Sequence, residues 1–200
     1  MEQNDIWAQM AARYDTENRV NSANIIAQAV RKALSDTQGK AAMDFGCGTG
    51  LVGLGLIDLF SSMLFVDASP EMTEQVQWKI ERSQLENATV LCADFLADPP
   101  RAPVADCIIA AQVLLHIPDT RLVMKRLYDA LTEGGRLIVV DFNKNDAVPS
   151  DRVHNGFDQN ELIDMAKQTG FVTAASHTFY RGEKLFMGQD ASMFLLNAQK

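Results

Sequence analysis

A short motif near the first quarter of the chain has the residue types and spacing most suited to chemistry. One acid stands two positions before three glycines at alternating positions; these are Asp44, Gly46, Gly48 and Gly50. Glycines at this spacing allow the backbone to turn sharply after a strand, and a ligand can approach the main chain because no Cβ lies in the way. A helix-like run, Leu51 to Phe60, follows, so its free N–H groups would face the loop. The pattern predicts a loop for a nucleotide-type ligand.

Two cofactor classes fit this loop on spacing alone. Gly48, Gly50 and Gly53 match the Gly-x-Gly-x-x-Gly pattern of dinucleotide sites. Asp67 lies 19 residues after Gly48, near the roughly 20 residues expected of a ribose-binding acid. An NAD(P)-dependent oxidoreductase therefore stays open as an alternative.

Three features favour S-adenosylmethionine instead. Asp44 would repel a diphosphate and attract the ammonium group of a methionine moiety. A chain of 200 residues leaves little room for a separate substrate domain. After the third expected strand stands the pair Asp94-Phe95, an acid that could accept from an adenine amino group and a ring that could pack on the base.

The elements that would position these residues alternate along the chain. We expect strands at Ala41–Phe45, Met63–Val66, Thr89–Ala93, Asp106–Ala110 and Gly135–Phe142. We expect helices at Trp7–Tyr14 (weak), Asn18–Leu34, Leu51–Phe60, Pro70–Gln84, Asp119–Leu131 and Asp158–Thr169. Two last strand-like runs, Phe171–Phe179 and Ala191–Ala198, are joined by residues 180–190 without a helix and should pair antiparallel at the sheet edge. The fold class is α/β, a doubly wound, mostly parallel seven-stranded Rossmann-like sheet with a C-terminal antiparallel hairpin.

Local signals place two helix ends. Ser69 followed by Pro70 is typical of an N-cap with proline at the first helical position. The pair Gly134-Gly135 predicts the stop of the preceding helix.

Composition narrows the class of protein. The length of 200 residues, with 47% hydrophobic and 22% charged residues, predicts one domain over 1–200. We expect this domain to comprise an N-terminal helical lid (1–36), a cofactor-binding core (41–142), and an acceptor-pocket loop, helix and antiparallel strands (143–200). A net charge of −8 with scattered Lys and Arg argues against nucleic acid. No apolar run approaches the roughly 18 residues of a membrane span, so we expect a cytoplasmic protein with no membrane partner. The sequence carries no signal for an oligomeric state.

The three cysteines carry no metal or disulfide pattern. They are widely spaced with no Cys-x-x-Cys pair, so we expect no metal site. Cys47 would serve as a small loop residue, and Cys92 and Cys107 as small core residues within strands.

Five motifs in order resemble the class I S-adenosylmethionine-dependent methyltransferases of the small-molecule type, over roughly residues 7 to 198. They are Asp44-x-Gly46-x-Gly48-x-Gly50, Val66 to Met72, Ala93 to Phe95, Asp106 to His116 with the following Ile-Pro-Asp, and Leu131 to Leu137. The resemblance implies methyl transfer from S-adenosylmethionine to a small-molecule acceptor.

The resemblance also implies residue roles. Asp67 would hold both ribose hydroxyls and Met72 would pack near the adenine. Residues 7–15, ending Arg-Tyr-Asp, resemble the family's N-terminal helix that closes over the cofactor, with Tyr14 facing the methionine carboxylate or simply packing. The expected cofactor-binding set is Tyr14, Asp44, Gly46, Cys47, Gly48, Thr49, Gly50, Asp67, Ala68, Ser69, Met72, Asp94, Phe95, Ala111 and Gln112.

Two histidines are the candidate catalytic residues. His116 follows the fourth strand and could take a proton from an acceptor hydroxyl, or cap a turn. His154 lies in the loop after the fifth strand, and the turn signal Asn155-Gly156 leaves an exposed loop histidine as the alternative. Residues 111–119 and 143–158 should form the acceptor pocket. The motifs of nucleic-acid amino and C5 methylation and of arginine methylation are missing, which leaves small molecules; a non-catalytic cofactor-binding protein is a third hypothesis.

Overall fold

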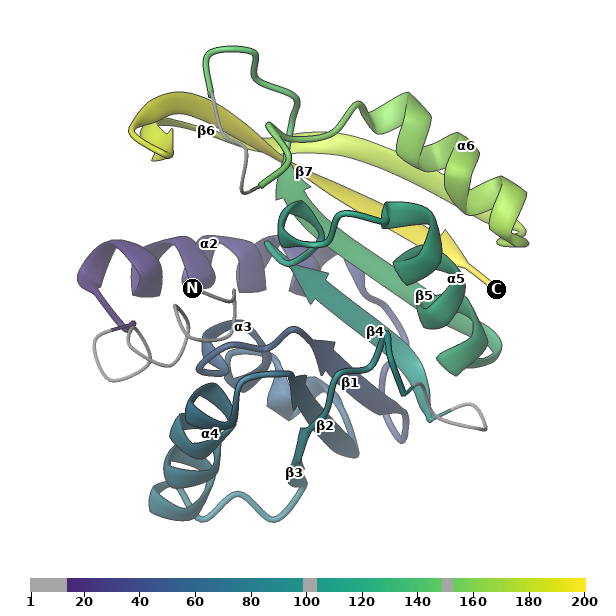
Figure 1. The fold of residues 1–200 in the computed structure, drawn as a ribbon. Coiled ribbons are helices and arrows are strands. Elements are labelled where there is room, and N and C mark those ends of the chain that lie inside the picture. Colours follow the sequence, from purple (N-terminus) through teal and green to yellow (C-terminus); the bar gives the residue numbers. More distant parts are fainter. Residues whose placement is uncertain (1–13, 99–103, 149–152) are drawn as a thin grey trace.

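The structure, a computed structural model, describes residues 14–98, 104–148 and 153–200 of the chain. Seven strands form one sheet in the order β3-β2-β1-β4-β5-β7-β6 (Figure 1). The strands are β1 (Ala41–Phe45), β2 (Ser62–Asp67), β3 (Ala88–Cys92), β4 (Ala105–Ala111), β5 (Leu131–Phe142), β6 (Thr173–Phe186) and β7 (Gln189–Gln199). Strands β1 to β5 are parallel, and β7 is antiparallel to both β5 and β6. The predicted mostly parallel sheet with a C-terminal antiparallel hairpin is confirmed.

Helices pack around this sheet. They are α2 (Glu17–Ala33), α3 (Leu51–Leu54), α4 (Pro70–Arg82), α5 (Thr120–Ala130) and α6 (Gln159–Thr169). In Figure 1, α5 and α6 lie side by side on the face toward the viewer, and α2 lies behind the sheet. The predicted N-cap of α4 is confirmed, because Ser69 accepts from the Met72 amide and Pro70 is the first helical residue. None of the helices in the described ranges is long and apolar enough to cross a membrane.

The central strands are buried on both faces, as parallel strands covered by helices must be. Residues such as Ile108 and Ile109 in β4, Val139 in β5 and Phe194 in β7 have no exposed surface. This core brings the carboxyl ends of β1, β2 and β4 to one edge of the sheet. The chain order reverses there, since β1 lies between β2 and β4, and such a point is where open α/β sheets bind ligands.

The expected helix over residues 51–60 is wrong in its length. The segment forms only the four-residue α3 and, separately, a 3-10 turn at Ile57–Leu59. Gly53 and Gly55 interrupt this segment, and each glycine costs about 1 kcal/mol of helix propensity relative to alanine. Tertiary contacts described below hold α3 in place.

The helix predicted over Asp119–Leu131 is confirmed as α5, but the stop signal assigned to Gly134-Gly135 lies beyond its end. Helix α5 ends at Ala130, and Leu131 is already extended and pairs with Ala105 of β4. Burial of Leu131 at the base of the sheet favours the strand over another helical turn. Gly134, with φ at +71°, lies within a register shift of β5.

The C-terminal hairpin is longer than expected. Strand β6 continues to Phe186, so the residues expected as a connection lie mostly in strands. Only Met187 and Gly188 join β6 to β7, with φ of +50° and +78°, the backbone of a tight two-residue hairpin turn. Because β7 pairs with β5, the edge of the sheet is β6.

Candidate functional site

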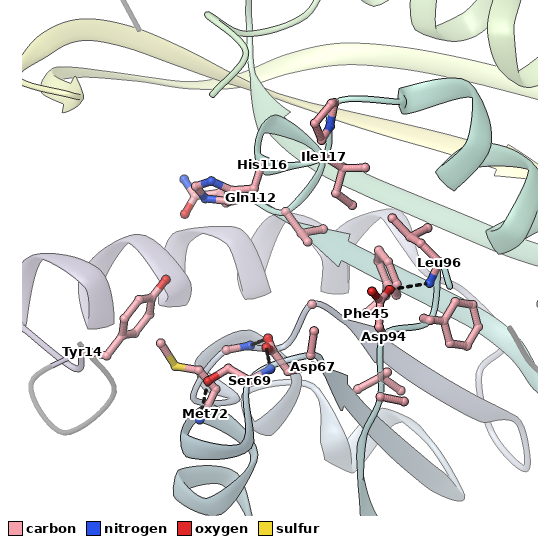
Figure 2. A pocket seen from close by; sticks show the side chains of 18 residues that line it. Tyr14, Phe45, Asp67, Ser69, Met72, Asp94, Leu96, Gln112, His116 and Ile117 are labelled. Atoms are coloured by element: carbon pink, nitrogen blue, oxygen red, sulfur yellow. Dashed lines mark hydrogen bonds between the residues drawn. The ribbon is translucent and has the colours of Figure 1, made fainter. Parts of the chain in front are cut away.

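A cavity of about 290 Å³ opens at the carboxyl ends of β1, β2 and β4. Figure 2 shows Asp67, Ser69 and Met72 on one side and Gln112 and His116 on the opposite side. Sequence-predicted residues that line it are Tyr14, Gly46, Gly48, Asp67, Ala68, Ser69, Met72, Asp94, Phe95, Gln112 and His116. Segments far apart in the sequence therefore meet at one place.

Asp67 is one of two carboxylates that line this cavity. One oxygen accepts from the Gly48 amide at 2.8 Å, and the other accepts from the Ser69 amide at 2.9 Å. Each carboxylate oxygen has two acceptor sites, so both oxygens can accept further hydrogen bonds after these two are made. The side chain is fixed at the end of β2 and remains able to bind two ligand hydroxyls.

Asp94 and Phe95 form another part of the wall. One Asp94 oxygen accepts from the Leu96 and Ala97 amides, both at 3.1 Å, so the acid caps its own turn as well as lining the cavity. Phe95 is buried, and its ring meets that of Phe45 edge-to-face with centroids 5.5 Å apart. These two rings make one wall apolar.

Asp44 does not occupy the place expected of it. It is 2% exposed, does not line the cavity, and accepts from the Gly53 amide at 3.0 Å in the first turn of α3. A Cβ at Gly53 would lie 2.4 Å from the Asp44 oxygen, so only glycine lets the helix rest on this carboxylate. Burial raises the pKa of Asp44 to about 7. The expectation of a carboxylate open to a ligand ammonium is therefore corrected: Asp44 supports the loop from inside.

Four other expected cofactor residues, Cys47, Thr49, Gly50 and Ala111, do not line the cavity either. Gly50 is the N-cap of α3 with φ at +79°. The Cys47 thiol lies 3.6 Å from the Gly48 carbonyl, and burial raises its pKa well above the ordinary value, which suits a structural residue. The wall beside Ala111 is made by the next residue, Gln112.

Thr49 belongs to a cluster that we call the N-terminal clasp, formed by Asp15, Thr49 and Lys79. The Thr49 hydroxyl donates to one Asp15 oxygen at 2.5 Å, and Lys79 Nζ lies 2.6 Å from the other. Lys79 also donates to the Thr49 carbonyl at 2.7 Å. The clasp joins the segment before α2 to the glycine loop and to α4.

Tyr14, the residue before the clasp, reaches the cavity as expected. The Arg19 guanidinium lies 3.9 Å from the centre of the Tyr14 ring. Burial raises the pKa of the Tyr14 hydroxyl. Residues 1–13 of the expected lid (1–36) lie outside the described residues, and the later part of the lid forms α2.

Cys107 is buried in β4, as expected, and burial raises its pKa to about 12. Cys92 is exposed, so its expected core position is wrong. The reason is topological, because β3 is an edge strand. Within the described residues, no group of His, Cys, Asp and Glu side chains could hold a metal ion.

Comparisons with known proteins agree with this geometry. A family model described as a methyltransferase domain matches residues 43–137. The ubiquinone/menaquinone biosynthesis C-methyltransferase of Agrobacterium fabrum is 26% identical over 173 residues, which cover 82% of this chain and 67% of that protein. An uncharacterized methyltransferase of Schizosaccharomyces pombe is 26% identical over 156 residues, covering 74% of this chain and 54% of its own. The matched domain and these relatives support the predicted class I S-adenosylmethionine-dependent methyltransferase.

Solved structures of methyltransferases share the fold of this chain. An S-adenosylmethionine-dependent methyltransferase from Aquifex aeolicus superposes with a TM-score of 0.72 at 16% identity and covers 96% of this chain and 97% of its own. Phosphoethanolamine N-methyltransferase 2 of Haemonchus contortus, in complex with S-adenosyl-L-methionine, gives a TM-score of 0.73 at 15% identity over 87% of this chain and 52% of that one. The chain thus spans about half the length of the yeast relative and of the nematode enzyme.

The methyltransferase motif after β4 supplies the wall opposite Asp67. Gln112 has a positive φ of +52°, a strained backbone for a residue other than glycine, and it lines the cavity. His116 ends the 3-10 turn Leu114–His116, and burial lowers its pKa to about 4. The imidazole is therefore neutral near pH 7, able to accept a hydrogen bond but a weak base.

The second expected catalytic histidine is corrected. His154 does not line the cavity, and its ring nitrogen Nε2 lies 2.9 Å from the Ile117 carbonyl. Residues 143–145 at the start of that loop line a separate hollow with the β6–β7 hairpin, bounded in part by Lys144 and Arg181. Residues 149–152 of that loop lie outside the described residues.

Sequence reasoning missed several residues of the site. Val113 and Ile117 line the cavity within the predicted acceptor segment 111–119, but Leu96 was not predicted, because nothing in its type distinguishes it from a core residue. The carboxyl group of Asp141, buried at the end of β5, was missed as well. An acid inside an otherwise apolar strand was the signal that could have found it.

Proposed function

We propose that this chain binds S-adenosylmethionine in the cavity and transfers its methyl group to a small-molecule acceptor. The observation that carries the proposal is the Asp67 carboxylate, fixed by the Gly48 and Ser69 amides beside the glycine loop. Its free acceptor sites suit a ribose diol. Met72, Asp94 and Phe95 lie along the same cavity, where an adenine would have an acid at one edge and apolar side chains at its faces.

The hydrogen bonds of the loop favour this cofactor over a dinucleotide. A bound diphosphate accepts hydrogen bonds from free backbone amides at the start of the helix that follows the glycine loop. Here the Gly53 amide donates to Asp44, and the Gly48 amide donates to Asp67. The Gly50 amide donates to the Cys47 carbonyl at 2.8 Å. These donors are already used within the protein, and the Asp67 carboxylate lines the cavity that an anionic ligand would have to enter.

When bound, S-adenosylmethionine supplies an electrophilic methyl group on a sulfonium, which displacement by an acceptor atom converts to S-adenosylhomocysteine. The chain's part is mainly to hold the two reactants in line at contact distance, which can replace much of the entropic barrier. Phe45 and Phe95 exclude water from one wall. His116 stands on the opposite wall, where its neutral ring would accept a hydrogen bond from an acceptor hydroxyl.

The names of the similar proteins indicate methylation of different kinds of acceptor atom. They include a C-methyltransferase and an O-methyltransferase of ubiquinone biosynthesis and a phosphoethanolamine N-methyltransferase. These names support a small-molecule acceptor without selecting the atom that is methylated.

Calorimetric titration with S-adenosylhomocysteine, S-adenosylmethionine and NADH tests the cofactor. We expect one site for each of the first two ligands and none for NADH; saturable NADH binding with no response to S-adenosylhomocysteine would overturn the proposal. An assay for S-adenosylhomocysteine release, run over panels of phenols, amines and thiols, then tests turnover. Binding with no product on any panel would support the non-catalytic alternative.

A further inference from the structure

We infer that Asp141 and His154 are positioning residues, which together hold the turn that presents His116 to the cavity. The turn comprises residues 113–118, and four of its members line the cavity: Val113, His116, Ile117 and Pro118. The significance of this wall rests on the proposed function, because it would face the methyl acceptor. Neither Asp141 nor His154 lines the cavity itself.

Asp141 supports the turn from the sheet. Its side chain is 0% exposed, and one oxygen accepts from the Leu115 amide at 3.2 Å while the other accepts from the Phe142 amide at 2.9 Å. A buried carboxylate is tolerated only when hydrogen bonds replace those it made to water. The end of β5 is therefore tied to the backbone of the turn.

His154 supports the same turn from the loop after β5. Its backbone amide donates to the Leu115 carbonyl at 2.8 Å, and its ring Nε2 lies 2.9 Å from the Ile117 carbonyl. A carbonyl only accepts hydrogen bonds, so this contact requires the proton on Nε2. Leu115, the neighbour of His116, is thus held at both backbone groups by two distant segments.

The loop segment that carries His154 is itself bound to the end of β5. The His154 ring lies 5.2 Å from that of Phe157, and the Phe157 amide donates to the Phe142 carbonyl at 2.9 Å. Asp141 and His154 are therefore connected through the same end of β5.

The turn needs outside support because its own bonds are few. The His116 amide donates to Val113 and the Ile117 amide to Leu114, both at 3.0 Å, which is one short 3-10 turn with weak internal geometry. Asp141 and His154 therefore help to fix the backbone on both sides of His116. This gives His154 a role other than the proton transfer expected from its sequence position.

Histidine NMR tests the inference in the intact protein, with or without S-adenosylhomocysteine. The chain has three histidines, and His177 on β6 serves as an internal reference. With ¹⁵N-labelled imidazole, His154 should show the Nε2–H tautomer. His154→Ala should shift the His116 resonances and leave those of His177 unchanged. His154→Gln, whose side-chain amide can donate to the same carbonyl, should largely restore the His116 resonances. Asp141→Asn should shift His116 as well, because a carboxamide can accept only one of the two amide bonds in the same way.

Three NMR results would overturn the inference: an Nδ1–H tautomer at His154, unchanged His116 resonances in His154→Ala, or equal shifts in the Ala and Gln variants. Thermal unfolding and the S-adenosylhomocysteine dissociation constant of each variant distinguish loss of folding from displacement of the turn that carries His116. We expect the dissociation constant to stay within about twofold of wild type, since no residue on the cofactor side of the cavity is altered. The NMR outcome does not depend on turnover, so it can fail or succeed independently of the proposed function.

Steady-state kinetics with an acceptor found in the panels tests the same inference. His154→Ala should lower kcat/KM for that acceptor at least about tenfold, because small misplacements of a reacting group cost that much or more. His154→Gln should recover most of this loss. Equal kcat/KM in wild type and His154→Ala would contradict the inference.

Discussion

Three aspartates show how hydrogen-bond partners decide what a single side chain does. Asp67 lines the cavity, and its two backbone partners leave acceptor sites for a ligand. Asp44 and Asp141 are sealed inside the protein and hold backbone amides of α3 and of the turn before α5. Only the first is placed to bind a cofactor.

Replacing Asp67 by asparagine should weaken S-adenosylhomocysteine binding by roughly 1–3 kcal/mol, the usual range for lost charge-assisted hydrogen bonds. Calorimetry measures the change. Glu74→Gln, an exposed substitution on α4 that also removes one negative charge, is the matched control and should bind normally. Wild-type affinity in the Asp67 variant would remove this residue from the cofactor site.

Gly53→Ala should destabilise the protein through steric conflict. The added Cβ would meet the Asp44 carboxylate at 2.4 Å and the Phe65 ring at 2.5 Å, and overpacking of this kind typically costs about 1–3 kcal/mol. Gly55→Ala, whose Cβ would meet nothing closer than 3.3 Å, should cost less. Urea unfolding compares the two variants, and a larger loss in Gly55→Ala would contradict the packing described for Asp44.

His116 should remain neutral over the physiological pH range. Burial lowers its pKa to about 4, below the value of about 6.5 in an unfolded chain. The unfolded state then binds more protons between these values, so this one group makes the free energy of unfolding rise with pH across that window. An NMR titration should find no change of the His116 ring above about pH 5.5; a midpoint near 6.5 would show that the ring is open to water.

At the scale of elements, the N-terminal clasp couples three parts of the chain around the cavity. Asp15 lies just before α2, Thr49 in the glycine loop and Lys79 in α4. Tyr14 precedes Asp15 and lines the cavity, so the clasp holds a cavity-lining side chain in place.

Lys79→Met should therefore speed the dissociation of S-adenosylhomocysteine. A partly exposed ion pair contributes up to about 1 kcal/mol, which corresponds to roughly a fivefold faster release. Stopped-flow measurements at low and high salt follow the rate, and the difference between wild type and variant should shrink as salt screens the pair. Lys32→Met, an exposed change on α2, should leave the rate unchanged. A salt-independent rate that is equal in Lys79→Met and wild type would show that the clasp does not hold Tyr14.

For the whole molecule, two buried carboxyl groups set an unusual dependence of stability on pH. Burial raises the pKa of both Asp44 and Asp141 to about 7. Between about pH 4 and 7 the folded state keeps protons that the unfolded chain releases, so the free energy of unfolding falls as pH rises, by at most about 1.4 kcal/mol per pH unit for each group. The lowered pKa of His116 has the opposite effect on the free energy of unfolding, but it belongs to a single group. Its effect ends at about pH 6.5, the pKa of a histidine in the unfolded chain.

Urea unfolding from about pH 5 to 8 measures the slope. Asp141→Asn should have a shallower decrease than wild type below pH 7, and Asp58→Asn, on an exposed residue whose pKa is lowered by Arg31, should keep the wild-type slope there. An identical slope in Asp141→Asn would mean that this carboxyl is charged in the folded protein.

Much of the architecture followed from local pattern. The alternating strands and helices from β1 to β5 agree with the expected ranges to within a few residues at most boundaries, because apolar period and caps act over short distances. The errors occurred where packing overrode local signals. Leu131 joined the sheet before the Gly134-Gly135 pair, and the hairpin strands extended through residues that look like a loop.

The sequence by itself determined the order of elements, the glycine loop and the carboxylate that faces the cavity. Glycine spacing and a strand-terminal acid express their function within a few residues, and the carboxyl ends of parallel strands must meet at one edge. Only the tertiary structure decided that Asp44 is sealed under α3 and that His154 supports a turn rather than lining the cavity. Their partners come from the chain's return to the same place, and the hydrogen bonds and burial made there follow from no spacing along the sequence.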